Sequence, residues 1–183
     1  SHIYSPPLRD GLIQKLKTVS DEWLKFTERN EIIFSQGMFV EKEIKEQTVI
    51  TVENREEKII AFLNIIPDYV ENEGTYDLLR KTADAPNGIM DYILIELFKY
   101  FKNSGIQYVN LGFAPMSGLD DPHNFPEKSM KFAYEKIRSF SHYKGQRDYK
   151  EKFNPQWNDK YLVYNNDYDL LQVPAVLARV IKL

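Results

Sequence analysis

The stretch TYDLLRKTADAPNGIMDYILIELFKYF, residues 75–101, carries the strongest structural pattern in the chain. After a Pro-Asn-Gly break at residues 86–88, apolar side chains recur at steps of one, three and four. They form one broad stripe made of Ile89, Met90, Ile93, Leu94, Leu97, Phe98 and Phe101. The pattern predicts a core helix with Asn87 as its N-cap. Asp91 falls in the first turn, where a carboxylate complements the positive end of the helix dipole.

Ahead of that break, Asp77 and Arg80 stand three residues apart in a short stretch of mixed charge. If residues 75–82 are helical, the two side chains share a face of the helix. The spacing alone favours an ordinary ion pair, and exposed pairs of this kind stabilise a protein little.

The chain has the length and composition of one soluble globular domain. Its 183 residues suffice for a buried core and are too few to suggest two domains. It contains no cysteine, which excludes disulfides, thiolate zinc sites and a cysteine nucleophile. The longest apolar run, residues 59–66, is far shorter than the roughly 20 residues that span a bilayer. We therefore expect the chain as given to be soluble.

The order of the predicted elements indicates an α/β (α+β) fold. Residues 8–27 have helical spacing and are expected to form two helices, or one kinked helix that restarts at Ser20. Short runs rich in Ile, Val and Phe then indicate an antiparallel meander with a tight turn at residues 54–57; these runs are residues 32–40, 48–52 and 59–66.

The second half of the chain is expected to add a crossover and further helices. The expected elements are a loop at 67–74, a buried strand at 107–113, a helix at 128–140, a short strand at 161–164 and a terminal helix at 170–183. This order is typical of the acetyltransferase-like (GNAT) fold, a mixed sheet flanked by helices. No repeat or linker divides the sequence, so we predict a single GNAT-like domain over residues 1–183.

Charge is distributed unevenly along the chain. Eight basic and three acidic residues lie between positions 128 and 152, which gives this block a net charge of +5 inside a chain of net charge −3. Such a block suggests an anionic partner, and a solvated face explains it equally well.

Aromatic residues interleave with the block, namely Tyr143, Tyr149, Phe153, Trp157 and Tyr161. Stacking on tRNA bases is one explanation, but their density favours core packing. The apolar stripe of the terminal helix likewise fits docking to the core better than contact with a bilayer.

Several common catalytic motifs are absent. No G-x-S-x-G elbow surrounds Ser117, and there is neither a Walker P-loop nor a Rossmann glycine fingerprint. His123 and His142 lack ligand-like spacing, so we expect no metal site. Acyl-CoA transferases of the GNAT fold carry a glycine-rich cradle for the pyrophosphate at the helix after the central strand. Here that helix begins with the single Gly88, which disfavours a CoA cofactor.

Four separated motifs closely resemble the cytosolic synthase part of the bacterial phosphatidylglycerol lysyltransferases, the multiple peptide resistance factors. These motifs are YDLLRKTADAPNGIMDYILIELF, VNLGFAPMSGL, KSMKFAYEKI and YKEKFNPQWNDKYLVY, and the similarity runs from about residue 20 to the C-terminus. In that family a multi-span transmembrane flippase precedes a synthase region of two GNAT-like halves. The chain is similar to the second, C-terminal half.

The resemblance implies transfer of lysine from lysyl-tRNA to phosphatidylglycerol at the cytoplasmic face of the bacterial membrane. The product lipid is cationic and lowers susceptibility to cationic antimicrobial peptides. Lysyl-tRNA is the co-substrate, and no cofactor is implied because an aminoacyl ester is already activated. The implied partners are lysyl-tRNA, phosphatidylglycerol, the N-terminal GNAT-like half and the flippase domain.

The resemblance also gives candidate site residues. Asp77 and Arg80 match the family's Asp-x-x-Arg position, so we assign Asp77 to a substrate ammonium and Arg80 to a phosphate or the reacting ester. A second cluster adds Arg147, Lys150, Glu151 and Lys152. Among these, Lys152 is expected to bind the lipid phosphate or the tRNA terminus, and Glu151 to bind lysine or act as a base. Arg80, Glu151 and Lys152 are the catalytic candidates, and Asp77, Asp91, Arg147 and Lys150 the substrate-binding ones.

Two other functions remain open from the sequence. One is an acyl-CoA-dependent N-acyltransferase, against which the missing glycine cradle counts. The other is a non-catalytic half that binds tRNA or anionic lipid through the basic block at residues 128–152. The sequence does not distinguish lysine from alanine or another amino acid as the transferred group.

Overall fold

The structure is a computed structural model that describes residues 1–28, 31, 37–114, 122, 127–128, 131, 141–161, 163, 165–166, 169, 172 and 176. The chain forms two compact units that meet in sequence between Asn110 and Leu111. The sequence has no linker at this point, and the expectation of a single domain stays a prediction. Each unit is described by itself.

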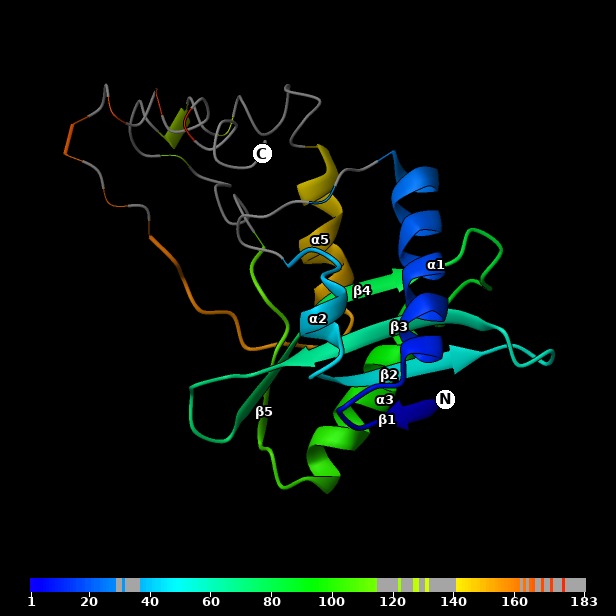
Figure 1. The fold of residues 1–183 in the computed structure, drawn as a ribbon. Helices are drawn as coiled ribbons and strands as arrows, with labels where there is room; N and C mark the ends of the chain where they lie inside the picture. Colours follow the sequence, from blue (N-terminus) through cyan, green and yellow to red (C-terminus); the bar gives the residue numbers. More distant parts are fainter. Residues whose placement is uncertain are drawn as a thin grey trace. The chain divides into compact units, whose positions relative to one another are not determined.

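The first unit is built on a five-stranded mixed sheet (Figure 1). Its strands lie in chain order: β1 His2–Tyr4, β2 Thr48–Glu53, β3 Ile59–Ile66, β4 Glu73–Lys81 and β5 Tyr108–Asn110. Strands β1 to β4 pair antiparallel with one another, and β5 runs parallel to β4. The β4–β5 ladder is short, because its pairs join only Glu73–Thr75 to Tyr108–Asn110.

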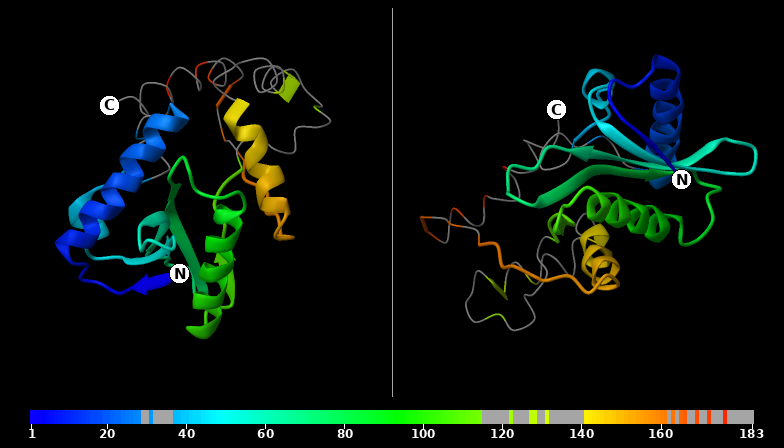
Figure 2. Two further views of the ribbon diagram at one scale, coloured as in Figure 1. Left: turned by 90° about the vertical axis from the view of Figure 1, so that its right-hand side faces the viewer. Right: turned by 90° about the horizontal axis from the view of Figure 1, so that it is seen from below.

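Two long helices cover the two faces of this sheet, as Figure 2 shows. Helix α1, Asp10–Thr27, packs on one face with the short helix α2, Glu41–Ile44, nearby. Helix α3, Ile89–Asn103, packs on the other face. The α1 face holds a cluster of buried apolar side chains from both helices and the sheet, including Leu16, Val19, Ile44, Phe62 and Leu78. The predicted stripe of α3 is confirmed, since Ile89, Ile93, Leu94, Leu97 and Phe101 are buried.

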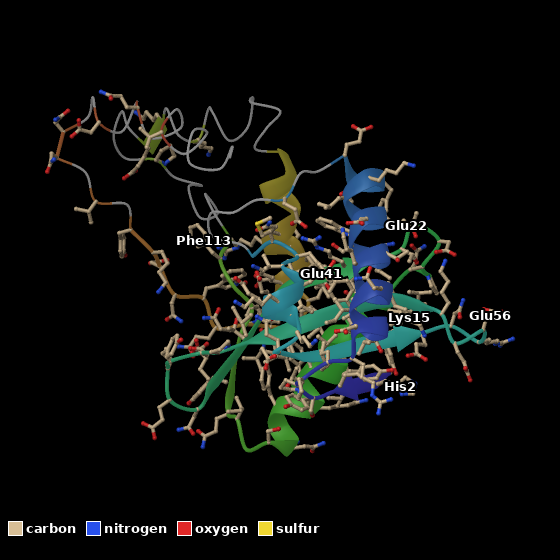
Figure 3. All side chains as sticks on the ribbon, in the orientation of Figure 1. His2, Lys15, Glu22, Glu41, Glu56 and Phe113 are labelled. Atoms are coloured by element: carbon tan, nitrogen blue, oxygen red, sulfur yellow. The ribbon has the colours of Figure 1, made fainter. Side chains whose placement is uncertain are left out.

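The turn predicted at residues 54–57 joins β2 to β3. The Asn54 side chain accepts hydrogen bonds from the backbone N–H groups of Glu56 and Lys58, at 3.0 and 2.9 Å. This is the local bonding for which asparagine is favoured in turns. Figure 3 labels Glu56, which marks the tip of the hairpin.

Two expected helix boundaries change. Residues 10–27 form one helix, which is the second of the two expected alternatives; Ser20 is buried in its middle and does not cap a new helix. The N-cap of α3 is Gly88 and not Asn87. Gly88 has φ 84°, a conformation that glycine adopts without the steric cost of a side chain. Asp91 does lie in the first turn of α3, as predicted.

The largest correction concerns residues 73–81, which form strand β4. The sequence suggested a loop at 67–74 followed by a short charged turn or helix, so the strand was missed. The buried strand expected at 107–113 is shorter and less buried than predicted, since β5 comprises only Tyr108–Asn110 and its Tyr108 and Asn110 are exposed. No strand is present at residues 37–40, and the rest of the predicted strand at 32–40 lies outside the described residues.

The second unit, from Leu111 to Arg179, has α5, Ser141–Glu151, as its best described element. Residues 127, 128 and 131 are helical, and the rest of the predicted helix at 128–140 lies outside the described residues. Tyr161 and Val163 are not in a strand, and the other two residues of the predicted strand at 161–164 are not described. Of the predicted terminal helix, only Gln172 and Val176 are described, and both are helical. Within the described part of the chain, no helix combines the length and apolar character needed to cross a bilayer.

Candidate functional site

Arg80, predicted as a catalytic residue, is buried in the first unit and is only 4% exposed. Its guanidinium forms a two-pronged ion pair with Glu31. Nη1 donates to Oε1 at 2.8 Å, and Nη2 donates to Oε2 at 2.6 Å. Such paired hydrogen bonds match the planar guanidinium to the planar carboxylate and are stronger than single ones. A buried arginine charge needs a partner of this kind, and Glu31 supplies it.

Helix α1 completes the surroundings of Arg80. The Ser20 hydroxyl accepts a second hydrogen bond from Nη1, and the Trp23 ring lies 5.3 Å from the guanidinium carbon. Ser20 and Trp23 are three residues apart on α1, so both side chains reach the same face of the helix. The guanidinium is therefore held on three sides by protein groups. The assignment of Arg80 to a substrate phosphate would require Glu31 to be displaced.

Asp77 contacts Gly37, six residues after the Glu31 that pairs with Arg80. Its Oδ1 accepts a hydrogen bond from the backbone N–H of Gly37 at 2.8 Å. The approach is so close that a Cβ atom on Gly37 would lie 1.7 Å from Oδ2 of Asp77. Glycine at position 37 is thus what allows the Asp77 carboxylate to lie against this backbone.

A β-bulge explains why Asp77 and Arg80 lie on one face of the sheet. Residues three apart in a regular strand point to opposite faces. Between the pairs Leu63–Leu79 and Ile65–Tyr76, however, β3 contributes one residue and β4 contributes two, Asp77 and Leu78. The extra residue lets both side chains point toward α1. Leu78 belongs to the α1-face core, and Gly37 leads into Phe39, which packs against that core.

The shared face predicted for Asp77 and Arg80 is therefore observed, although not for the helical reason given. Glu31, the partner of Arg80, also accepts the backbone N–H of Phe39 on its Oε1 at 3.3 Å. Asp77 and Arg80 both fasten to β4 the part of the chain that carries Glu31, Gly37 and Phe39. We call these five residues the β4 clamp.

A further hydrogen bond joins α1 to the turn that follows β4. The Glu22 carboxylate, labelled in Figure 3, accepts the backbone N–H of Ala83 at 2.9 Å. Thr82, just after β4, is fully buried and donates its hydroxyl to the carbonyl of Ile60 at 3.4 Å. The first bond holds the end of β4 next to α1, and the second holds it to β3.

Asp91 is not brought together with the clamp. It lies in the first turn of α3, and α3 covers the face of the sheet opposite to α1. Asp91 is half-buried there, where its charge complements the helix dipole. Its assignment to substrate binding stays a prediction.

In the second unit, Lys150 has the most distinctive environment of the four candidates on or next to α5. Its Nζ donates a hydrogen bond to the backbone carbonyl of Phe113 at 3.0 Å. Burial lowers the pKa of Lys150, because the charged ammonium loses water. Gly112 lies beside it with φ 78°, and a Cβ there would be 3.8 Å from Nζ. The glycine allows a backbone turn that directs the Phe113 carbonyl to the lysine.

Arg147 and Glu151 both contact the indole ring of Trp157. They are four residues apart, so they share a face of α5. The guanidinium carbon of Arg147 lies 4.5 Å from the Trp157 ring centroid, and Glu151 Oε2 accepts the indole N–H at 2.7 Å. Glu151 is thus already a hydrogen-bond acceptor for Trp157, which counts against its action as a free base.

Lys152 is exposed, and its ammonium lies 4.9 Å from the Tyr149 ring centroid. Tyr149 in turn packs edge-on against Phe153, with ring centroids 5.9 Å apart. Tyr149, Phe153 and Trp157 therefore pack with cations of this block or with one another. The observed contacts agree with the packing explanation for Tyr149, Phe153 and Trp157. Tyr161 differs, since it is 83% exposed.

The predicted site residues thus fall into three groups. Asp77 and Arg80 belong to the β4 clamp in the first unit, Asp91 lies on the opposite face of the sheet, and the four candidates on or next to α5 lie in the second unit. Sequence reasoning missed Glu31, Ser20, Gly37 and Trp157, because each is joined to its partner only by the fold. Among the described residues, no group of three or more side chains is arranged to hold a metal ion. An open hollow at the end of α3, lined by Phe98, Phe101 and Val109, includes none of the candidates.

Comparison with known proteins identifies relatives along almost the whole chain. A family model described as "Phosphatidylglycerol lysyltransferase, C-terminal" matches residues 2–164. A phosphatidylglycerol lysyltransferase of Bacillus subtilis is 34% identical over 98% of the chain, and one of Staphylococcus haemolyticus is 32% identical over 96%. The chain covers 21% of each of these relatives.

Two solved structures share the fold. One is L-PGS from Bacillus licheniformis, which is 33% identical with a TM-score of 0.78; the match covers 99% of this chain and 56% of that one. The other is the C-terminal domain of a putative lysylphosphatidylglycerol synthetase from Agrobacterium fabrum, 30% identical with a TM-score of 0.78, over 98% of this chain and 52% of that one. The predicted fold is confirmed: it is α+β and GNAT-like, with a mixed sheet flanked by helices.

Proposed function

The chain belongs to the family of phosphatidylglycerol lysyltransferase C-terminal domains, and on this basis we propose that it takes part in lysyl transfer to phosphatidylglycerol. The observation that carries the proposal is the match of residues 2–164 to that family. The chain spans about a fifth of the length of the curated relatives it matches. The proposal is therefore that it acts as the C-terminal half of a synthase region, together with an N-terminal GNAT-like half and a transmembrane flippase domain.

The proposed donor is lysyl-tRNA, and the acceptor is a glycerol hydroxyl of phosphatidylglycerol at the cytoplasmic face of the membrane. The hydroxyl oxygen bonds to the lysyl carbonyl carbon, and the ester bond to the tRNA ribose breaks. The proton of the lipid hydroxyl passes to the leaving ribose oxygen. Because the donor is an ester, the reaction needs neither ATP nor CoA. The cationic lipid product would lower susceptibility to cationic antimicrobial peptides.

The two clusters suggest separate contributions to this reaction. Asp77 carries a half-buried carboxylate in the β4 clamp, and such a group favours a substrate ammonium. In the second unit, the exposed Lys152 and the half-buried Arg147 suit phosphate oxygens of the lipid or of tRNA. Arg80 forms an ion pair with Glu31, so its proposed role is to stabilise the structure of the β4 clamp and not to contact the ester.

The test uses Asp77→Asn, which keeps an oxygen able to accept the Gly37 N–H and removes the charge. Labelled lysyl-tRNA and phosphatidylglycerol vesicles are supplied to the chain, alone and joined to its upstream synthase half. We expect labelled lipid from the wild type and a loss on the order of 100-fold in Asp77→Asn, as for removal of one well-placed charged contact. The control is Glu71→Gln, an exposed acid in the β3–β4 loop, which should keep full activity.

The absence of labelled lipid from the joined wild-type protein would contradict the proposed transfer. In that case, binding of tRNA or anionic vesicles that is lost in Lys152→Ala, but kept in the exposed control Lys160→Ala, would support the non-catalytic alternative. Lysine label on the lipid, set against alanyl-tRNA as a competing donor, would identify the amino acid that is transferred.

A further inference from the structure

Asn64 is a polar side chain in the most buried strand of the sheet. Strand β3 reads IIAFLNII, and Asn64 is 1% exposed. Its amide is hydrogen-bonded at both ends: Nδ2 donates to Gln47 Oε1 at 2.8 Å, and Oδ1 accepts the backbone N–H of Leu78 at 2.7 Å. A buried amide is costly unless it is bonded in this way, so a strand of pure packing function would carry an apolar residue here.

The bond to Leu78 falls at the β-bulge of β4. Opposite Asn64, β4 contributes Asp77 and Leu78 where a regular ladder would have one residue. A bulge leaves the extra residue without its usual backbone partner. The Asn64 side chain takes the place of that partner, since it accepts the Leu78 N–H in a buried position. Gln47, at the residue before β2, holds the amide in the orientation that makes this bond.

The bulge decides which way Asp77 points. Without it, a regular β4 would place Asp77 and Arg80 on opposite faces, because side chains alternate along a strand. With it, Asp77 reaches Gly37 and Arg80 reaches Glu31 on the α1 face. The alignment of the Asp-x-x-Arg pair therefore depends on a residue of the neighbouring strand.

We propose that Asn64 is a positioning residue: by holding the Leu78 N–H it fixes the bulge that brings Asp77 and Arg80 to one face of the sheet. This inference rests on the proposed function only in so far as the Asp77–Arg80 pair serves lysyl transfer. Asn64 itself lies in the sheet interior and acts through these two residues, without contact to substrate.

The structural part of the test uses amide NMR and hydrogen exchange on the 183-residue chain. Asn64→Leu removes both hydrogen bonds at similar volume, and Asn64→Asp restores an oxygen toward Leu78. We expect Asn64→Leu to lower the exchange protection of the Leu78 amide and to shift the Gly37 amide signal, and Asn64→Asp to recover most of both. The control is Leu63→Val, a fully buried neighbour whose substitution leaves the Leu78 acceptor in place.

The functional part measures lysyl transfer in the joined protein. We expect Asn64→Leu to lower the rate about 10- to 100-fold, the size expected when a site residue is displaced by about an ångström. Asn64→Asp should restore most of the rate, and Leu63→Val should lose little, at matched folded fraction. If Asn64→Leu does not fold, Gln47→Leu gives a second variant that frees the Asn64 amide and should change the same signals by a smaller amount.

The outcomes separate the two proposals. Unchanged Leu78 and Gly37 amides in folded Asn64→Leu would overturn the role of Asn64 even if the wild type transfers lysine. Changed Leu78 and Gly37 amide signals with an unchanged transfer rate would show that Asn64 sets the bulge, and would overturn its role in positioning the site for transfer. A wild type that makes no labelled lipid would remove the transfer function, whereas the amide signals would still decide whether Asn64 sets the bulge.

Discussion

The ion pair of Arg80 and Glu31 is largely buried in the first unit. Arg80 has 5% side-chain exposure and Glu31 has 24%, so the pair is shielded from most of the solvent. Removal of one member of such a pair destabilises the folded chain strongly. The remaining charge is then buried without a partner, and its lost hydration is not replaced.

We therefore expect Glu31→Ala to destabilise the chain by about 3 kcal/mol, because it leaves the Arg80 charge buried and unpaired. Urea unfolding followed by circular dichroism would measure the change. The matched variant Glu46→Ala removes an exposed glutamate and should change the free energy of unfolding by less than about 0.5 kcal/mol. Equal effects of the two variants would show that the Arg80–Glu31 pair has no special weight.

Tyr76 supplies a prediction about alkaline pH. Burial raises its pKa to about 12, because the phenolate would lose its hydration. An unfolded tyrosine loses its proton near pH 10, so between about pH 10 and 12 the unfolded chain binds fewer protons than the folded one. The stabilisation is thus present below pH 10 and is lost as the pH rises through this window.

The expected loss from Tyr76 is at most about 2–3 kcal/mol across the window. In Tyr76→Phe, stability should fall less steeply with pH, as measured by urea midpoints at intervals from about pH 9 to 11.5. Tyr69→Phe alters a side chain that is 97% exposed and should follow the wild-type curve. A Tyr76→Phe curve parallel to the wild type would contradict the burial of the phenol.

At the scale of elements, β4 shows what the sequence could and could not predict. Helix α3 was predictable because its apolar period is unbroken, and β2 and β3 were predictable because β-branched residues surround a clear turn. Strand β4 was missed because its bulge interrupts the two-residue alternation on which strand prediction depends. Glu31, 49 residues before Arg80, lacked any pattern linking it to β4. The Asp77–Arg80 pair was found through family resemblance, and its shared face followed from the bulge.

The packing of β4 against α3 gives a further prediction. Gly74 is buried, and a Cβ there would lie 2.5 Å from the Phe101 ring. Gly74→Ala should destabilise the chain by about 1–3 kcal/mol, because the buried ring cannot move away freely. Thermal unfolding would measure the effect, and Phe101→Leu in the same chain should relieve part of it. The control Gly11→Ala, on α1 with open space around its Cβ, should be neutral or stabilising.

At the scale of the whole molecule, the first unit places the clamp and the second unit places the basic and aromatic residues of α5. The fold class and the family were predictable from the sequence, since they depend on element order and on long motifs. The environments of Lys150 and Glu151 were not, because they depend on Phe113 and Trp157 lying beside α5. Within the part of the basic block that the structure describes, Arg147, Lys150 and Lys152 each contact a specific neighbour.

The two-pronged bond between Arg80 and Glu31 also limits which residues relatives can carry at positions 31 and 80. Lysine at position 80 would keep the charge but lose the planar fork and the stacking on Trp23, so this exchange is not conservative. Loss of either member alone leaves the other as a buried charge without its partner, whereas replacement of both by apolar residues removes two charges at once. Positions 31 and 80 should therefore co-vary, so that a lineage without the acid is also without the arginine.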